Sequence, residues 1–204
     1  MSFNFEQPAK KLCRNSNKIN LLPQLFEFKA RVDNWLPLEE LLLTLNPVFK
    51  GIDFQEDTYF NVPYGRLKLR EGSIENALIH YHRSNVAGAK PSDVLVCRHN
   101  PERALKEILI KALGIKIIIK KSRKIYFIDN VKFHFDEVEG LGNFIEVEAI
   151  DKDGTIGMEK LKGQCNYFIS LFEIKNEAFI AESYSDLLLK KNPGMPANSY
   201  TIST

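Results

Sequence analysis

The chain has 204 residues, of which 44% are hydrophobic and 11% aromatic, enough to form one packed domain with tails. Its 28 basic and 26 acidic residues leave a net charge of +2, which excludes a global electrostatic attraction to nucleic acid or membranes. No secretory signal and no apolar run of membrane-spanning length is present, so we expect a soluble, cytoplasmic protein. Cys13, Cys97 and Cys165 lack disulfide or metal spacing and are expected to be reduced.

Strand-like segments dominate the chain. We expect strands at about 25–32, 49–61 (as two extended pieces, 49–54 and 55–61), 65–71, 77–83, 93–99, 115–127, 131–137 and 143–150. We expect helices at 36–45, at 100–113 with Asn100 as cap, at 157–172, and at 186–191 with Ser183 or Ser185 as cap. Eight strands joined mostly by hairpins predict an antiparallel α+β fold, an eight-stranded β-barrel with helices packed outside. The expected domain spans 23–191, between a polar N-terminal extension (1–22) and a flexible C-terminal tail (192–204).

Charged and apolar residues alternate with period two in several of these strands. In the first strand, Glu27, Lys29 and Arg31 leave one face, while the phenylalanines leave the other. The same alternation of charged and apolar residues recurs around Arg70, around Arg123 and around Glu146. One such strand is usually the solvated face of an antiparallel sheet, and edge strands favour bases. Four such strands, some basic and some acidic, favour a cavity lined for a polyanion and a divalent metal.

The candidate metal ligands are carboxylates. Glu146 and Glu148 lie two apart on one strand and therefore point to one side. Asp136 lies an even number of residues from Lys132 and His134, so that, by this parity, the three side chains point to the same face of their strand. Glu27 is a further candidate from the first strand. Such hard oxygen ligands suit Mg²⁺ or Mn²⁺. The alternative is that Glu146 and Glu148 are surface acids paired with lysines.

The candidate phosphate ligands are bases on the same strands. They are Lys29, Arg31, Arg70, Arg83, Lys121 and Arg123. Four further bases are weaker candidates because strand parity or strand breaks can turn them outward: Arg66, Lys68, Lys120 and Lys124. His80 and His82 have no metal-ligand spacing, and a solvated or core role suits them better. No helix has a basic face, which disfavours duplex reading, and no nucleophile motif is present. Metal-assisted phosphoryl or nucleotidyl transfer is the chemistry that these residues favour.

The ordered set of these motifs resembles the CYTH superfamily, the class IV adenylate cyclases and thiamine triphosphatases, over about residues 24–190. The motifs are Glu27-Phe28-Lys29-Ala30-Arg31, Asp57-Thr58-Tyr59-Phe60, Leu67-Lys68-Leu69-Arg70-Glu71, Lys121-Ser122-Arg123-Lys124 and the stretch from Asp136 to Glu148. The resemblance implies a triphosphate tunnel that uses two divalent ions, Mg²⁺ or Mn²⁺. It implies that Glu27, Asp136, Glu146 and Glu148 hold metal and that the six bases grip phosphates, with Glu27, Lys29 and Glu146 as catalytic residues.

One residue departs from the family pattern. The family's opening signature is Glu-x-Glu-x-Lys, and Leu25 stands in place of its first acid. One carboxylate fewer is then available to bind metal or to orient water. The leading hypothesis is a class IV adenylate cyclase-like conversion of ATP to cyclic AMP and pyrophosphate. The alternatives are hydrolysis of an inorganic or organic triphosphate, and binding of a triphosphate without catalysis. The expected partner is a small triphosphate such as ATP or tripolyphosphate, not nucleic acid or a membrane, and a homodimer is left open.

Overall fold

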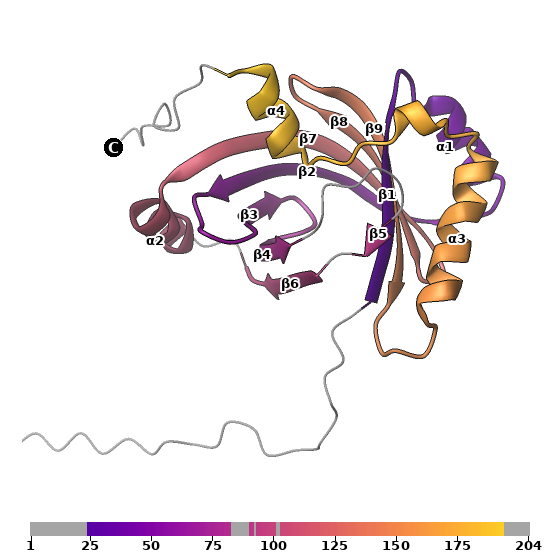
Figure 1. Cartoon of the computed structure of the whole chain (residues 1–204), viewed down its shortest axis with the longest axis horizontal. Coiled ribbons are helices and arrows are strands. Elements are labelled where there is room, and N and C mark those ends of the chain that lie inside the picture. Colours follow the sequence, from indigo (N-terminus) through magenta and orange to yellow (C-terminus); the bar gives the residue numbers. More distant parts are fainter. Residues whose placement is uncertain (1–23, 83–89, 92, 101–102, 194–204) are drawn as a thin grey trace, which may run out of the picture.

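The computed structural model describes residues 24–82, 90–91, 93–100 and 103–193 (Figure 1). Arg83 and both terminal segments, 1–23 and 194–204, lie outside the described residues. The elements in the described ranges are β1 (Gln24–Val32), α1 (Leu36–Leu43), β2 (Val48–Phe60), β3 (Arg66–Gly72), β4 (Ala77–His82), β5 (Lys90–Pro91), β6 (Asp93–Arg98), α2 (Arg103–Leu113), β7 (Ile115–Ile128), β8 (Val131–Val138), β9 (Gly142–Asp151), α3 (Met158–Leu171), the 3₁₀ helix η1 (Asn176–Ala178) and α4 (Tyr184–Lys191).

The strands form one antiparallel sheet in the order β5-β1-β9-β8-β7-β2-β3-β4-β6. Eight of them are the predicted strands, and they curl into a half-barrel (Figure 1). The additional strand, β5, has two residues and pairs with Phe26 and Glu27 of β1. Because only residue 92 separates β5 from β6 in the chain, the two ends of the sheet are connected by the polypeptide itself. The α+β barrel prediction is confirmed.

The remaining edge of β1 is covered by the segment that follows η1. The backbone N–H of Ile180 donates to the carbonyl of Lys29 over 2.9 Å, and Phe179 forms an antiparallel bridge with Ala30. β1 is thereby paired on both sides along much of its length, which fixes the position of its inward-facing side chains.

One strand differs from the sequence-based expectation. The extended pieces 49–54 and 55–61 form a single strand, β2, whereas the strand expected at 115–127 is present as the continuous strand β7. The pairing between β2 and β7 shifts register between Phe49 and Gly51, where Gly51 has φ +132°. A bulge of this kind bends a strand without ending it, and glycine accepts the required backbone angle. The long curved strands are what wrap the sheet around its concave face.

The last helix begins earlier than expected. α4 starts at Tyr184, two residues before the predicted start at 186, because Ser183 forms a capping box with Asp186. The prediction of Ser183 as cap is therefore confirmed. This shift places Tyr184 in the first turn, where its side chain is buried against the inner face of the sheet.

The two faces of the sheet carry different residues. The convex face is apolar: Phe28, Phe133 and Ile145 are at most 1% exposed and pack with side chains of α1 and α3. The concave face carries the alternate residues of the same strands, among them Lys29 and Glu146. Period-two alternation thus assigned the faces of β1 correctly. The hydrophobic core lies between sheet and helices, whereas the half-barrel interior carries the buried charged side chains beside some apolar ones.

A second apolar cluster closes one end of the half-barrel. Ile117, Ile119 and Phe144 from the sheet pack with Tyr184 and with Leu188 of α4. Figure 1 shows α4 lying across β7 at this end. The half-barrel interior is therefore capped on one side and continues toward β4 and β6.

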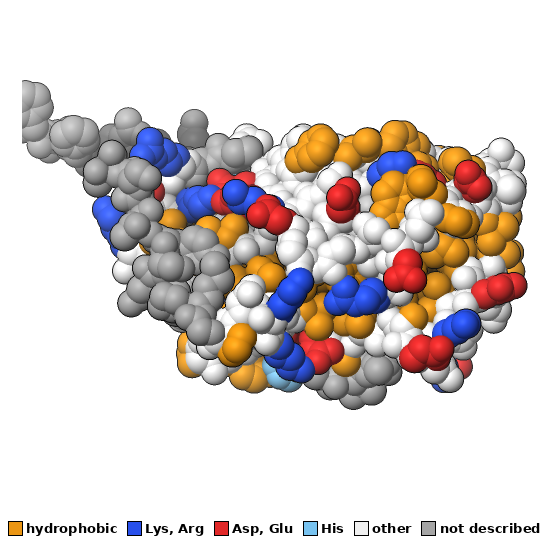
Figure 2. All heavy atoms as spheres, turned by 90° about the horizontal axis from the view of Figure 1, so that it is seen from above, with side chains coloured by type: hydrophobic (Ala, Val, Ile, Leu, Met, Phe, Trp, Pro, Cys, Tyr) orange, Lys and Arg blue, Asp and Glu red, His pale blue; other side chains and the backbone are white. Residues whose placement is uncertain are grey.

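The outer surface shows no separation of charge among its described residues on the face seen in Figure 2, where basic and acidic side chains are intermixed. Among the described helices, none has the length and apolar character needed to cross a membrane.

Candidate triphosphate and metal site

The concave face encloses a cavity of about 600 Å³, within the range of small-molecule sites. Its lining includes eight basic side chains: Lys29, Lys68, Arg70, Arg98, Lys121, Arg123, Lys132 and Lys152. It also includes four acids: Glu27, Glu75, Glu146 and Glu148. The protein's overall charge is almost balanced, so this twofold excess of bases is a local arrangement that suits a polyanion.

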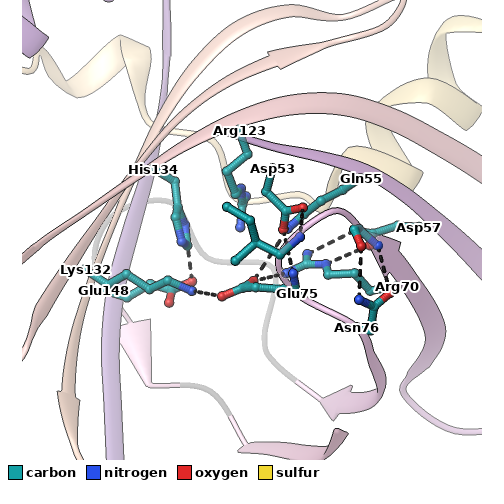
Figure 3. Close-up of polar contacts among 12 residues, drawn as sticks. Asp53, Gln55, Asp57, Arg70, Glu75, Asn76, Arg123, Lys132, His134 and Glu148 are labelled. Atoms are coloured by element: carbon teal, nitrogen blue, oxygen red, sulfur yellow. Dashed lines mark hydrogen bonds and ion pairs between the residues drawn. The ribbon is translucent and has the colours of Figure 1, made fainter. Parts of the chain in front are cut away.

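One buried carboxylate organises the bases at the β2–β3 side of the cavity. Asp57 accepts from the Nζ atoms of Lys68 and Lys121, each over 2.8 Å. It also accepts from Nε and Nη2 of Arg70, over 2.8 and 3.1 Å (Figure 3). Three cations therefore share one carboxylate. Cross-strand pairing of Asp57 with Arg70 places this group. One negative charge cannot neutralise three cations, which leaves the cluster able to accept a further anion.

The pKa values reflect this imbalance. Burial alone would raise the pKa of Asp57, but the charges of Arg70, Lys121 and Lys68 outweigh burial and hold it well below its usual value. Burial and the neighbouring Arg70 lower the pKa of Lys68 to about 7. Burial, opposed in part by Asp57, lowers the pKa of Lys121 to about 8. Both lysines therefore titrate near neutral pH in the free protein.

Tripolyphosphate binding at pH 8 is expected to take up about one to two protons, because a bound anion raises the pKa values of Lys68 and Lys121. Affinity should fall as the pH rises from 7 to 9, since protonated lysines are the binding form. Calorimetry in buffers of different ionisation enthalpy measures the uptake directly. Lys68→Met should bind with about one proton fewer. Equal proton uptake by the variant and the wild type would contradict this assignment.

A second acid, Glu75, connects two parts of the cavity wall. Its oxygens accept from Lys132 over 2.6 Å and from Arg70 over 3.0 Å (Figure 3). Burial would raise the pKa of Glu75, but Lys132 and other nearby cations lower it well below its usual value. The backbone N–H of Glu75 donates to buried Asp53 over 3.0 Å, and a Cβ at Gly72 would lie 2.6 Å from the same carboxylate. Asp53 and Gly72 thus shape the β3–β4 link that presents Glu75.

Arg123 is held from two sides. Its guanidinium donates to both oxygens of Asp136, over 2.6 and 2.5 Å, and to Glu146 over 2.8 Å. The Tyr184 hydroxyl donates to Asp136 over 2.7 Å. Burial would raise the pKa of Asp136, but Arg123 outweighs it and the pKa is lowered. Asp136, which we predicted to hold metal, accepts hydrogen bonds from Arg123 and Tyr184 and is not among the residues that line the cavity; its role as a metal ligand stays a prediction. Its placement suits the positioning of Arg123.

Glu146, Glu148 and His134 form a cluster of potential metal ligands on β8 and β9. One ligand atom from each lies within 4.8 Å of the others. Glu146 also lies 3.2 Å from Lys29. Burial would raise the pKa of Glu146, but Lys29 and other neighbours outweigh burial and hold that pKa well below its usual value. Burial raises the pKa of Glu148 to about 7, and burial with Arg123 nearby lowers that of His134 to about 3. Two carboxylates and a neutral imidazole are a donor set that fits a divalent ion.

The structure brings most of the predicted site residues together. Cavity-lining members of that set are Glu27, Lys29, Arg70, Lys121, Arg123, Glu146 and Glu148. Glu27 is the direct cross-strand neighbour of Glu148. Arg31 is exposed at the end of β1, bonds the Leu141 carbonyl and lies over the Phe144 ring, outside the cavity lining. Arg83 lies outside the described residues. The individual roles of these residues stay predictions.

Several residues of this site were not among the predicted ligands, including His134 and Lys132 of β8. Lys68 lines the cavity although we ranked it a weak candidate. Its parity with Arg70 was the available signal. Asp57 belongs to a quoted motif, but Glu56 beside it breaks the alternation of charged and apolar residues. Glu75 lies in a link between strands, where a period of two predicts no face. Lys124, another weak candidate, bonds Glu39 of α1 instead.

The structure is thus an antiparallel half-barrel around a basic cavity that holds a carboxylate cluster. The CYTH domain model matches residues 25–164, and the chain belongs to the CYTH family. A relative from Methanocaldococcus jannaschii, provisionally named an adenylate cyclase, is 26% identical over 171 residues, covering 79% of this chain and 96% of the relative.

Solved structures share the fold. The PH1012 protein of Pyrococcus horikoshii has a TM-score of 0.65 at 24% identity, covering 80% of this chain and 98% of the other. A Hippeastrum protein, provisionally named an adenylyl cyclase and described as having a dominant triphosphatase activity, has a TM-score of 0.53 at 14% identity, covering 88% of this chain and all of the other.

Proposed function

We propose that the protein binds a nucleoside triphosphate in the cavity and converts ATP to cyclic AMP and pyrophosphate. The observation that supports this most is the two-part lining of the cavity. The bases around Asp57 and Glu146 form one part. Apolar side chains form the other: Leu25, Ile79, Val94, Val96 and Ile150. An inorganic polyphosphate has no apolar group that could pack on such a wall, whereas the base and sugar of a nucleoside can pack on it.

In this proposal the bases hold the triphosphate and its leaving group. Lys68, Arg70 and Lys121 bind oxygens of the β- and γ-phosphates in place of part of their contact with Asp57. Arg123, fixed by Asp136, orients its guanidinium toward the same chain of phosphates. The reaction forms a bond between the ribose 3′-oxygen and the α-phosphorus, breaks the bond to the β-phosphate oxygen and releases the hydroxyl proton.

The carboxylates supply the metal-binding part of the site. Glu146 and Glu148, with Glu27 beside Glu148, would hold Mg²⁺ or Mn²⁺. When bound, the ion neutralises phosphate charge and lowers the pKa of the attacking hydroxyl. Lys29 contacts Glu146 at 3.2 Å and Tyr184 through its ring at 4.3 Å, so it keeps that carboxylate ionised and in place.

The wall beside the carboxylates favours cyclisation over hydrolysis. Leu25 pairs across β1 and β9 with Ile150, and both line the cavity next to Glu27 and Glu148. An apolar pair cannot hold a water molecule by hydrogen bonds. A nucleophile that belongs to the substrate itself, the 3′-hydroxyl, needs no such water.

A product-resolved assay tests the proposal. Purified protein with ATP and Mg²⁺ or Mn²⁺ is expected to yield cyclic AMP and pyrophosphate in equal amounts. Formation of ADP and phosphate without cyclic AMP would replace the proposal by triphosphatase activity. This is the second candidate because the adjacent carboxylates Glu27 and Glu148 are also placed to orient water. Parallel reactions with GTP, thiamine triphosphate and tripolyphosphate identify the preferred substrate.

Leu25→Glu is expected to shift the products toward hydrolysis. The new carboxylate would stand beside Glu27 and Glu148, add a hydrogen-bond acceptor for water and remove part of the apolar wall. We expect the ratio of ADP to cyclic AMP to rise about tenfold or more. Leu25→Met, which keeps an apolar side chain of similar volume, is the matched control and should leave the ratio unchanged. An unaltered ratio in Leu25→Glu would show that the residue does not determine the nucleophile.

A further inference from the structure

His134 forms no hydrogen bond of normal geometry in the described part of the protein. Its side chain is 1% exposed, and neither buried ring nitrogen, Nδ1 or Nε2, has a well-formed hydrogen bond, although Nδ1 contacts the carboxylates of Glu146 and Glu148. Polar atoms that are buried without a well-formed hydrogen bond are destabilising. The ring is nevertheless held on the inner face of β8, where it lines the cavity and points toward the carboxylates (Figure 3).

The ring nitrogen faces two carboxylate oxygens at distances close to those in a shared coordination sphere. Nδ1 lies 3.4 Å from Oε2 of Glu146 and 3.7 Å from Oε1 of Glu148. Two ligands bound at 2.0–2.1 Å and at right angles to one another are about 3 Å apart, so a small inward movement suffices. Cross-strand pairing of His134 with Glu146 fixes this approach through the backbone.

A nitrogen donor changes which ion such a site prefers. Mg²⁺ binds almost entirely through oxygen, whereas imidazole suits the later first-row ions, and Mn²⁺ accepts mixed oxygen and nitrogen ligands. We propose that His134 is a direct metal ligand, together with Glu146 and Glu148, and that it makes this protein select Mn²⁺ over Mg²⁺. The inference deepens the proposed function, since it uses the same carboxylates, but it concerns the metal and not the reaction.

The surrounding charges agree with a site that is filled by a cation. Glu146 already contacts Lys29 and Arg123, yet each carboxylate oxygen keeps a second lone pair for a ligand bond. Lys132 is the cross-strand neighbour of Glu148, but its Nζ donates to Glu75. The carboxylate of Glu148 lines the cavity, where a cation can reach it.

The test uses Mn²⁺ alone as the probe. Pulsed electron paramagnetic resonance of the wild-type protein with Mn²⁺ is expected to show modulation from a directly bound ¹⁴N nucleus. Labelling the protein with [¹⁵N]histidine should convert this signal to that of ¹⁵N without any mutation. A bound Mn²⁺ that shows no nitrogen coupling, or no binding of Mn²⁺ at all, would overturn the inference.

Variants assign the nitrogen to one residue. His134→Asn should abolish the nitrogen signal and weaken Mn²⁺ binding by about 100-fold, with a much smaller effect on Mg²⁺. His134→Asp, which offers oxygen in place of nitrogen, should bind both ions with little discrimination and serves if the Asn variant does not fold. His82→Asn is the control, because His82 is exposed and stacks on Tyr64. A nitrogen signal that survives His134→Asn would refute the assignment.

The two proposals fail in different ways. Nitrogen-coordinated Mn²⁺ without cyclic AMP formation leaves the metal ligand in place and removes the cyclase reaction. Cyclic AMP formation with an oxygen-only Mn²⁺ site does the reverse.

Discussion

Glu146→Gln is expected to lower kcat by about 100- to 1,000-fold while changing KM little. Glu146 contacts Lys29 at 3.2 Å and Arg123 at 2.8 Å, and it belongs to the cluster that fits a divalent ion. The amide keeps the shape of the side chain but loses the charge that a cation needs. Most phosphate contacts would persist, because Lys68, Arg70 and Lys121 are organised around Asp57.

Initial rates of pyrophosphate release across a range of ATP and Mn²⁺ concentrations measure this effect. The matched control is Glu137→Gln on the same sheet, since Glu137 is exposed on β8 and faces away from the cavity. The control should keep wild-type kinetics. A kcat in Glu146→Gln equal to that of the wild type would remove Glu146 from the catalytic site.

Much of this site was predictable because a strand has a fixed side-chain period. Parity placed Glu27 and Lys29 of β1 on the same side as each other and opposite the phenylalanines, and the structure has them facing the cavity. Parity gives the face of the sheet but not the depth along the barrel. Arg31 shares the face of Lys29, yet it lies where β1 ends and is exposed.

Cross-strand register was the main information that the sequence lacked. Asp136 has the parity of a cavity residue, and only its pairing opposite Arg123 shows that a guanidinium takes both of its oxygens. His134 has the same parity, and its pairing opposite Glu146 brings it to the carboxylates. Register depends on how distant strands associate, so no local pattern distinguishes these two residues.

Residues in links between strands were the second gap. Glu75 reaches Arg70 and Lys132 because Asp53, twenty-two residues earlier, accepts from its backbone N–H. That conformation depends on a contact between distant positions. The β4–β6 wall was likewise hidden, because Ile79 and Val96 look like ordinary strand residues until the curled sheet turns them inward.

Three cations, Lys68, Arg70 and Lys121, surround the Asp57 carboxylate inside the half-barrel. Their mutual repulsion is expected to lower the free energy of unfolding, and binding of a polyanion would offset this loss. Lys68 and Lys121 have pKa values lowered by burial to about 7 and about 8, so the folded protein binds fewer protons there than the unfolded chain. Between these values and the unfolded pKa of about 10.4, stability contributed by these lysines therefore rises with pH. A bound polyanion raises both pKa values again and relieves the repulsion among the cations.

Asp57→Asn is expected to lower the free energy of unfolding by about 3–5 kcal/mol at pH 7, because it leaves Lys68, Arg70 and Lys121 buried without their common counter-charge. The penalty should grow as the pH falls, since both lysines must then carry protons, and shrink toward pH 9. Tripolyphosphate should raise the melting temperature of the variant more than that of the wild type, because it supplies the missing charge.

Urea unfolding at pH 6 and 9, with and without tripolyphosphate, measures both effects. Glu56→Gln, on the opposite face of β2 in a half-exposed pair with Lys106, is the control and should cost less than about 1 kcal/mol. A pH-independent penalty that tripolyphosphate does not reduce would mean that Asp57 acts through packing, and that the three cations are not held ready for a phosphate chain.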